Sequence, residues 1–579
     1  MEHLGFGLRT RLLRWLAGLA IVAALAACGA GGGGTPAPPP ADGTNALSTN
    51  PPPPPASGSA PAREDAVRFL TQATFGLKQV GEIDTLVSTG YERWLWDQFH
   101  TDAASHLAYL DAQKARETDK DHPAGQYTEE MSYEAVWQQW LRGPDQLRAR
   151  VAFALSEILV ISNIAPDLNP LAMSSYMDML NRNAFGNYRT LLEDVTLHPA
   201  MGYYLNMLRS EKEDPDRGTH PNENYAREVL QLFSIGLVKL NPDGSVQLGA
   251  GGKPIPTYGQ DEIAGFAKAF SGWSFAGADT ANPDSFEDGN ENWTQPMKAW
   301  PAKHSSAEKL LLNGQKLPAG QTPEQDMKGA LDAIFQHPNV GPFIGRQLIQ
   351  RLVTSNPSPA YIQRVADVFA NDGSGVRGNL KAVVRAILLD PEARDPARAA
   401  DGRFGKQREP VIRFANYLRA TNAASASGSN RIHYLDSADN ALGQSPLLSP
   451  SVFNFFSPNY RQPGRIAAAG LYSPEFQITT ETSVVGSLNF FSGLVNDGGY
   501  GWEEPHRLKM NYAPLEALAG DPAALAERLN WLLYAGAMSA DTRALLVATV
   551  AALDAADKTA RVKAALILTA ISPDYVIQK

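Results

Sequence analysis

Cysteine is almost absent from this chain: Cys28 is the single cysteine among 579 residues. One thiol excludes intrachain disulfides, multi-cysteine zinc sites and iron–sulfur clusters. Stripes of basic residues interleaved with aromatics are also missing, and the formal net charge is −10. Because an acidic surface repels phosphate, we expect no nucleic-acid partner.

Several widespread catalytic patterns are missing too. The sequence has no Gly-x4-Gly-Lys-Ser/Thr loop, no dinucleotide glycine fingerprint after a strand, no His-Glu-x-x-His and no Gly-x-Ser-x-Gly. Their absence argues against nucleotide, zinc-protease and serine-hydrolase chemistry.

The amino-terminal segment contains an export signal. Three arginines between residues 9 and 14 precede an apolar run over 15–27, and Cys28 directly follows Leu25-Ala26-Ala27. The run of 13 residues is shorter than the roughly 20 that cross a bilayer, so a transmembrane anchor is disfavoured.

The tetrad that ends in Cys28 resembles the bacterial lipobox, whose cysteine becomes the lipid-bearing terminus of the mature protein. We therefore predict a lipoprotein signal peptide over 1–27 and lipidation of Cys28; the alternative is an ordinary signal peptide with a chance cysteine. Gly29 follows the cysteine, and the resemblance implies sorting to the outer membrane.

Composition divides the rest of the chain into a tether and a folded body. Residues 28–62 consist mostly of Gly, Pro, Ala, Ser and Thr, so they form a tether that is unable to bury a core. Residues 63–579 repeat apolar side chains at helical spacing, with helix ends predicted at four X-Pro steps, 198–199, 337–338, 390–391 and 572–573.

The predicted fold is mainly α: a large multi-helical globular body with one short β-hairpin and long irregular loops. The hairpin is expected over 240–248, where Pro242-Asp243-Gly244 supplies the turn. A further boundary is expected near residues 305–325, and the irregular loops are expected over 277–303 and 423–472.

The densest polar cluster runs from His220 through Phe233. Asn222 is a predicted N-cap, and helical spacing places Tyr225, Val229 and Phe233 on an apolar arc. The opposite arc holds Glu223, Asn224, Arg227 and Glu228. That polar arc either is solvated, with Glu223 and Arg227 as an i,i+4 ion pair, or faces inward with His220 as an acid–base or cation site.

Other candidates lie outside this cluster. Asp261 is predicted to be an N-cap or first-turn acid, and Arg346 either pairs with a carboxylate of the cluster or lies on the surface. Trp273, Trp293 and Trp300 either form an aromatic platform for sugar rings or cover a core edge. The sequence indicates no cofactor. If a ligand binds these carboxylates, a divalent cation of unknown identity suits them.

Six segments resemble the large bacterial family known as "domain of unknown function 1800", and the likeness covers roughly residues 64–579. They are 68–76, 221–237, 258–273, 343–348, 408–410 and 453–460. The resemblance implies an exported, mainly helical protein, often encoded beside a sulfatase-like exported protein. It implies no reaction or catalytic residue, but it favours the 222–228 segment as the functional centre.

Two functional hypotheses follow. The first is an envelope lipoprotein that binds or assembles with another exported protein, attached to the membrane through its lipid. The second is an envelope hydrolase of polysaccharide or glycoconjugate, with Glu223 and Glu228 as paired carboxylates. They differ in whether the polar arc lies in a walled cleft or in bulk solvent.

Overall fold

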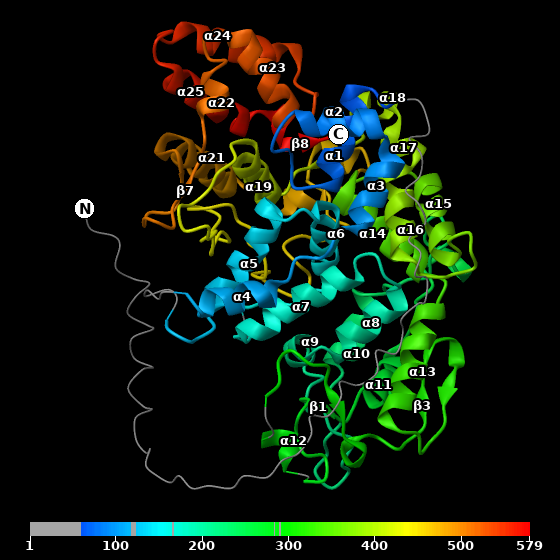
Figure 1. Cartoon of the computed structure of the whole chain (residues 1–579). Coiled ribbons are helices and arrows are strands. Elements are labelled where there is room, and N and C mark those ends of the chain that lie inside the picture. Colours follow the sequence, from blue (N-terminus) through cyan, green and yellow to red (C-terminus); the bar gives the residue numbers. More distant parts are fainter. Residues whose placement is uncertain (1–59, 117–122, 165–166, 283, 289–290) are drawn as a thin grey trace, which may run out of the picture. The chain divides into compact units, whose positions relative to one another are not determined.

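In the computed structural model of this chain, the helical spacing of the sequence corresponds to 26 α-helices among the described residues (Figure 1). The structure describes residues 60–116, 123–164, 167–282, 284–288 and 291–579. The predicted mainly α fold is confirmed. The predicted signal peptide, Cys28 and nearly all of the tether lie outside these residues.

The first nine helices build one side of the body. The packing of α4, α5 and α6 on α7 places most of α5 and α7 in the interior. The helices are α1 (Arg63–Ala73), α2 (Gly81–Thr89), α3 (Tyr91–His100), α4 (His106–Lys114), α5 (Glu129–Arg142), α6 (Gln146–Ser156), α7 (Pro170–Asn183), α8 (Tyr188–Leu197) and α9 (Pro199–Tyr204).

The next helices and four of the strands form the lower part of Figure 1. They are α10 (Asn224–Gln231), α11 (Gln260–Ala269), β1 (Trp273–Ser274), α12 (Ser285–Asp288), β2 (Lys298–Ala299), β3 (Lys309–Leu310) and β4 (Lys316–Leu317). Strands β1 and β2 pair, as do β3 and β4, and α11 packs on β3.

The middle of the chain returns to long helices, of which α14 and α15 pack extensively together. These elements are α13 (Pro323–Gln336), α14 (Val340–Leu352), α15 (Pro359–Ala370), α16 (Leu380–Leu389), α17 (Pro391–Arg394), α18 (Pro396–Ala400), β5 (Lys406–Gln407) and α19 (Pro410–Ala420).

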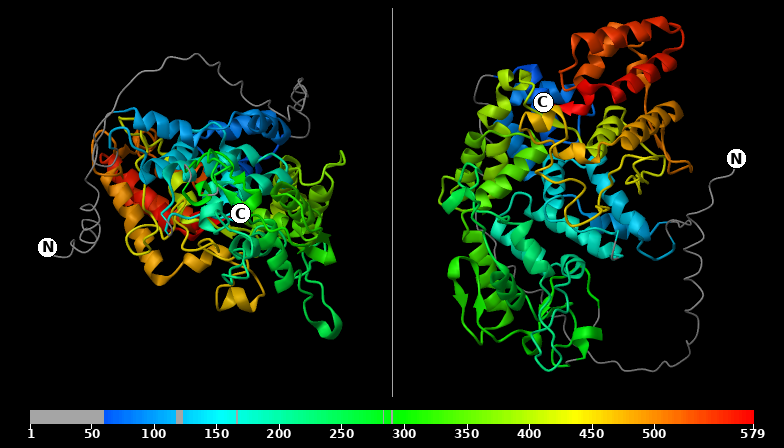
Figure 2. Two further views of the ribbon diagram at one scale, coloured as in Figure 1. Left: turned by 90° about the horizontal axis from the view of Figure 1, so that it is seen from below. Right: turned by 180° about the vertical axis from the view of Figure 1, so that it is seen from behind.

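The last part of the chain reaches the end of the body opposite β1–β4, where its later helices lie, as Figures 1 and 2 agree. Its elements are α20 (Arg465–Ala468), α21 (Glu481–Asp497), β6 (Gly499–Tyr500), β7 (Leu508–Lys509), α22 (Ala513–Glu516), α23 (Pro522–Leu532), α24 (Ala540–Ala552), α25 (Lys558–Ile571), α26 (Pro573–Val576) and β8 (Ile577–Gln578).

Proline sets several helix ends where the sequence predicts them. Helix α8 ends just before His198-Pro199, α13 before His337-Pro338, α16 before Asp390-Pro391 and α25 before Ser572-Pro573. In each pair the residue before proline has an extended backbone, because the proline ring disfavours the helical region there.

The strands differ from the prediction of a single hairpin. The 240–248 turn forms, with a bridge between Leu240 and Val246 and an Asn241 N–H donating to Ser245 O at 2.8 Å. The described residues also contain four antiparallel two-stranded sheets, including β5–β8 and β6–β7. Strands of two residues are too short for an alternating pattern, so the sequence does not reveal them.

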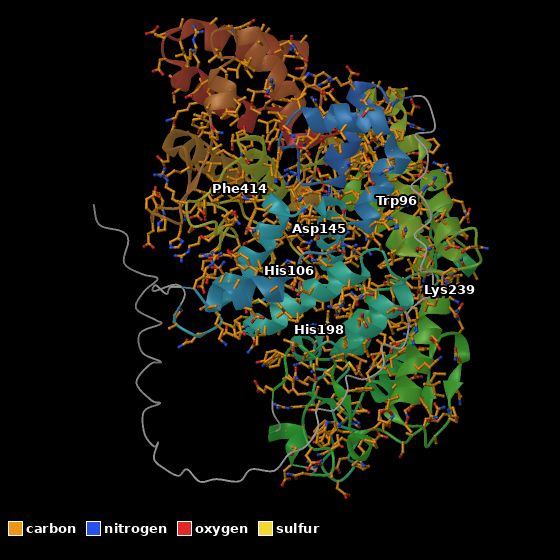
Figure 3. All side chains as sticks on the ribbon, viewed as in Figure 1. Trp96, His106, Asp145, His198, Lys239 and Phe414 are labelled. Carbon is orange, nitrogen blue, oxygen red and sulfur yellow. The ribbon has the colours of Figure 1, made fainter. Side chains whose placement is uncertain are left out.

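Aromatic side chains from distant segments fill the core. Phe414 of α19, labelled in Figure 3, packs edge-on against Trp137 of α5 with 5.4 Å between ring centroids. Phe75 stacks on Trp140 at 4.3 Å, which fastens the end of α1 to α5. In the described part of the chain no helix has both the length and the apolar composition that crossing a bilayer requires.

Candidate functional site

The polar arc of α10 is divided between solvent and interior. Glu223 and Arg227 are partly exposed and form the predicted i,i+4 pair, with 3.2 Å between Oε2 and Nη2. Gln260, at the start of α11, donates to both oxygens of Glu223 at 2.9 and 2.8 Å. This side of the arc is a solvated ion pair, as the first of the two interpretations of the polar arc predicts.

Glu228 lies in a different environment from Glu223. Only 7% of its surface is exposed, and its Oε2 is buried without a hydrogen-bond partner. Burial raises the pKa of Glu228, although Arg227 opposes the shift. Burial and the charge of Glu228 together raise the pKa of Tyr204 and of Tyr258 to about 12. Five residues along a helix correspond to a rotation of about 140°, so the two carboxylates do not face one another.

The amino-terminal end of α10 borders an open hollow of about 420 Å³ that contains His220 and Asn222. Both residues are exposed. The N-cap of α10 is Glu223, one residue later than the predicted Asn222, and Asn222 Oδ1 accepts from the Asn224 N–H at 2.9 Å. Asn224 donates through its amide to Asn206 Oδ1 at 3.1 Å. These three predicted residues therefore lie close together, at the surface.

Asp261 and Arg346 have different surroundings in the structure. Asp261 is exposed in the first turn of α11, beside Gln260, as a first-turn acid. Of the two interpretations of Arg346, the pairing with a carboxylate of α10 is wrong. Its guanidinium donates to Asn459 Oδ1 at 2.9 Å and lies over the Tyr472 ring, because the irregular segment 453–472 packs against α14.

Two of the three candidate platform tryptophans belong to the interior. Trp273 and Trp300 are 3% and 2% exposed, so neither ring offers a face to a sugar. Trp293 is partly exposed but is enclosed by Tyr203 and Phe275, at 5.4 and 4.7 Å between centroids. The platform prediction is therefore wrong for Trp273 and Trp300, which cover core edges.

A cation site of three or more His, Cys, Asp or Glu side chains is not found among the described residues. The acids of the 277–303 loop that are described include Asp284, Glu287 and Glu291, and they form no such group.

The structure contains a fully buried set of charges that the sequence analysis missed. We call it the buried charge network; its members are Arg150, Glu157, Arg351, Lys406, Glu409 and Glu475. Lys406 Nζ lies 3.0 Å from Glu475 Oε1 and 3.4 Å from Glu409 Oε1. Three cations thus share the interior with three carboxyl groups.

Glu157 and Glu409 titrate as a hydrogen-bonded pair within this network. Burial, and then the charge of Glu409, raise the pKa of Glu157 to about 8. Burial acts to raise the pKa of Glu409 too, but Lys406 and Arg150 outweigh it and lower that pKa. Glu157 therefore stays protonated at neutral pH and donates to the Glu409 carboxylate.

The network joins three of the segments that carry the family resemblance. Arg351 follows the 343–348 segment on α14, Glu409 lies in 408–410, and Asn454 of 453–460 donates to Glu157 Oε1 at 3.0 Å. An enclosed cavity of about 20 Å³ beside Glu157 has room for one water molecule. Charged residues inside apolar helical runs, such as Glu157 in Leu155–Leu159, are the signal that could have identified these positions.

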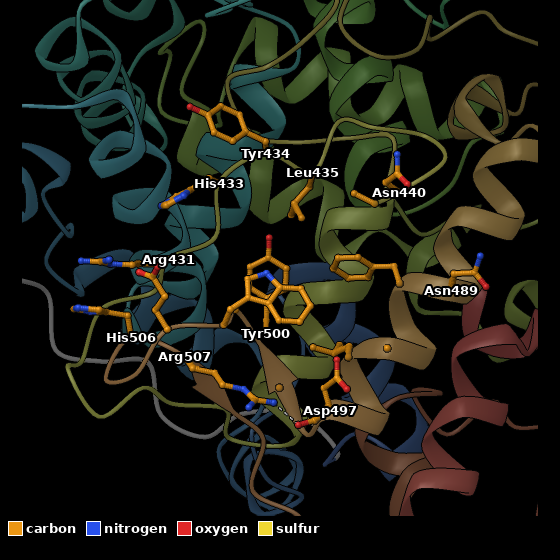
Figure 4. A pocket seen from close by; sticks show the side chains of 18 residues that line it. Arg431, His433, Tyr434, Leu435, Asn440, Asn489, Asp497, Tyr500, His506 and Arg507 are labelled. Atoms are coloured by element: carbon orange, nitrogen blue, oxygen red, sulfur yellow. Dashed lines mark hydrogen bonds between the residues drawn. The ribbon is translucent and has the colours of Figure 1, made fainter. Parts of the chain in front are cut away.

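An opening with aromatic walls was also missed. It has a volume of about 520 Å³ and lies between residues 431–441 and 489–507 (Figure 4). We call it the aromatic hollow; its rings are Tyr434, Phe490, Tyr500 and Trp502. Trp502 is 90% exposed and Tyr434 45% exposed, so these rings are open to a ligand.

Neither the curated proteins nor the solved structures include a match to this chain. The sequence model of one family matches residues 68–577, which span every site described above. By that match the chain belongs to the family described as "Protein of unknown function (DUF1800)".

Proposed function

We propose that this chain is an exported lipoprotein, anchored through Cys28 in the cell envelope, whose body binds another exported protein at the aromatic hollow. The export signal and the lipobox-like tetrad support the location. The exposure of Trp502 and Tyr434 in one hollow carries the binding assignment, since tryptophan, tyrosine and arginine dominate the energetics of protein interfaces.

Apolar side chains extend this surface along α21. Val484, Val485 and Leu488 are exposed on the helix that supplies Phe490, Leu494 and Asp497 to the hollow. Exposed apolar clusters beside polar groups are typical of protein-binding surfaces. Arg431 and Arg507 line the same hollow and supply polar contacts.

One wall of the hollow is held in place by two carboxylates of α5, of which Glu134 is buried. Glu134, which is fully buried, accepts from Tyr109 Oη at 2.8 Å and lies 2.9 Å from His433 Nε2. Tyr434 Oη donates to Glu130 Oε1 at 2.9 Å. A preformed surface loses little conformational entropy on binding, which favours affinity.

The hydrolase alternative has less support. It requires two carboxylates on either side of a bond, and Glu223 and Glu228 face different environments about 140° apart on α10. The sulfatase-like exported protein implied by the family resemblance is the first partner to test.

The experiment captures partners of the tethered protein from its own envelope. Trp502→Ser should reduce recovery of one exported protein at least fivefold, whereas Leu545→Ser, an exposed apolar residue of α24, should not. Equal recovery with both variants would reject the hollow as the interface. Release of glycan fragments that Glu228→Gln abolishes would favour the hydrolase instead.

Location needs a separate measurement. Labelling with a radioactive fatty acid should modify the wild-type chain and leave Cys28→Ala unlabelled and recovered in the soluble fraction. An unlabelled wild-type chain would overturn the lipid anchor while leaving the binding experiment valid.

A further inference from the structure

A second opening, of about 740 Å³, concentrates positive charge in this acidic protein. We call it the basic cleft; its charged lining is Lys78, Glu82, Arg142, Arg419 and Arg528. Four cations therefore face one carboxylate, although the whole chain has a net charge of −10. These residues come from the α1–α2 loop, α2, α5, α19 and α23, so the fold gathers the charge from distant segments.

Arg419 lies at the bottom of this cleft and is buried, with 3% of its surface exposed. Its Nε donates to Gly76 O at 2.7 Å and its Nη1 to Trp140 O at 3.0 Å. Carbonyl oxygens hold the guanidinium in place but carry no charge to neutralise it. Burial lowers the pKa of Arg419 to about 10, with Glu82 opposing the shift and Arg142 adding to it.

The one carboxylate in the cleft already has other partners. Glu82 Oε1 accepts from the backbone N–H groups of Lys78 at 2.8 Å and Gln79 at 3.0 Å, so it fixes the turn that begins α2. Burial lowers the pKa of Lys78, and the charges of Arg419 and Arg142 lower it further. Like charges thus repel one another here in the ligand-free protein.

We propose that the basic cleft binds the phosphate group of a polar phosphate monoester. Desolvated like charges cost folding free energy, and an anion that contacts several of them offsets that cost. Arginine pairs bidentately with phosphate oxygens, and a dianion suits a surplus of three positive charges better than a single carboxylate does.

The dimensions and the neutral lining identify the rest of the ligand. The volume lies within the range of small-molecule sites and far exceeds that of an inorganic phosphate ion. Asn422 and Asn511 are exposed at the edge of the cleft, where their amides suit hydroxyl groups. A sugar phosphate has both components, a dianionic head and a hydroxylated body.

Calorimetric titration of the mature chain tests the assignment with four probes: glucose 1-phosphate, inorganic phosphate, glucose and acetate. Glucose 1-phosphate should bind best and inorganic phosphate at least threefold more weakly, while glucose and acetate should give no binding heat. Inorganic phosphate binding as tightly as the ester would overturn the ester assignment. Acetate binding as tightly would overturn the preference for phosphate.

Two lining variants and one control locate the site. Lys78→Gln and Arg528→Gln should each weaken glucose 1-phosphate binding at least tenfold. Arg403→Gln removes the same charge from an exposed position outside the cleft lining and should leave binding unchanged. Loss of binding with all three variants, or with none, would overturn the location.

Thermal melting separates loss of binding from loss of folding. Because Lys78 is repelled by its neighbours, ligand-free Lys78→Gln should melt at or above the wild-type temperature while failing to gain stability from the ester. A variant that melts several degrees lower and still binds would contradict the proposed repulsion.

Discussion

Asn454 donates its side-chain amide to Glu157 Oε1 at 3.0 Å, a contact that fastens the 453–460 segment to the buried charge network. The two residues are 297 positions apart, and the second Glu157 oxygen lies 3.6 Å from Arg351 Nε. Glu157 therefore links α6, α14 and the 453–460 segment, so its protonation state bears on the stability of the whole body.

The first prediction concerns pH. The folded pKa of Glu157, about 8, lies above its ordinary value, so the folded state holds one more proton between roughly pH 5 and 8. Stability from this group is complete at low pH and is lost as the pH rises through about 8. Each pKa unit corresponds to about 1.4 kcal/mol, so we expect a loss of a few kcal/mol.

Glu157→Gln keeps a donor toward Glu409 and removes the ionisable proton. Urea unfolding at pH 5.5 and pH 9 should show a smaller difference for Glu157→Gln than for wild type, with Glu223→Gln as the partly exposed control. Equal pH dependence in Glu157→Gln and wild type would contradict the assignment.

The second prediction concerns charge balance in the network. Lys406→Met leaves Glu409 and Glu475 without their shared cation and should lower the free energy of unfolding by about 3–5 kcal/mol. Adding Glu475→Gln should restore part of that loss. Lys316→Met breaks the exposed pair with Glu308 and should change stability by about 0.5 kcal/mol or less.

The third prediction tests a close backbone approach. A Cβ at Gly265 of α11 would overlap the Leu310 carbonyl oxygen, so Gly265→Ala should separate α11 from β3 and destabilise the protein by more than about 2 kcal/mol. A Cβ added at Gly493 of α21 would meet open space. Gly493→Ala should therefore stabilise the protein by up to about 1 kcal/mol, because alanine has the higher helix propensity. Chemical denaturation of both variants compares them; similar changes would contradict the packing.

Local features were predictable because their causes lie within a few residues. The four X-Pro helix ends and the Glu223–Arg227 pair depend on neighbours in the sequence, and each is present in the structure. The burial of Glu228 depends on the packing of the whole chain around α10, which no helical spacing encodes.

A charge inside an apolar run can mark single members of the buried charge network, but which residues meet in the network and in the basic cleft was unpredictable for the same reason. Lys406 and Glu409 are close in sequence, but Arg150 and Arg351 reach them from helices far away. Arg346 illustrates the limit, because its partners, Asn459 and Tyr472, belong to a segment that has no helical spacing.

The last prediction separates the two carboxylates of the α10 region. Glu228→Gln replaces a buried carboxylate, whose Oε2 has no hydrogen-bond partner, by a neutral amide that costs less to bury. Because burial raises the Glu228 pKa, its ionised form destabilises the fold, and this cost grows as the pH rises. Glu228→Gln should therefore exceed wild type in stability at pH 8 by on the order of 1 kcal/mol and approach it at pH 4.

Glu223→Gln is the control, because Glu223 forms a partly exposed ion pair with Arg227. Its stability should stay within about 0.5 kcal/mol of wild type at both pH values. Guanidinium unfolding at the two pH values measures the difference, and a Glu228→Gln variant that is less stable than wild type at pH 8 would mean that the carboxylate has a stabilising partner.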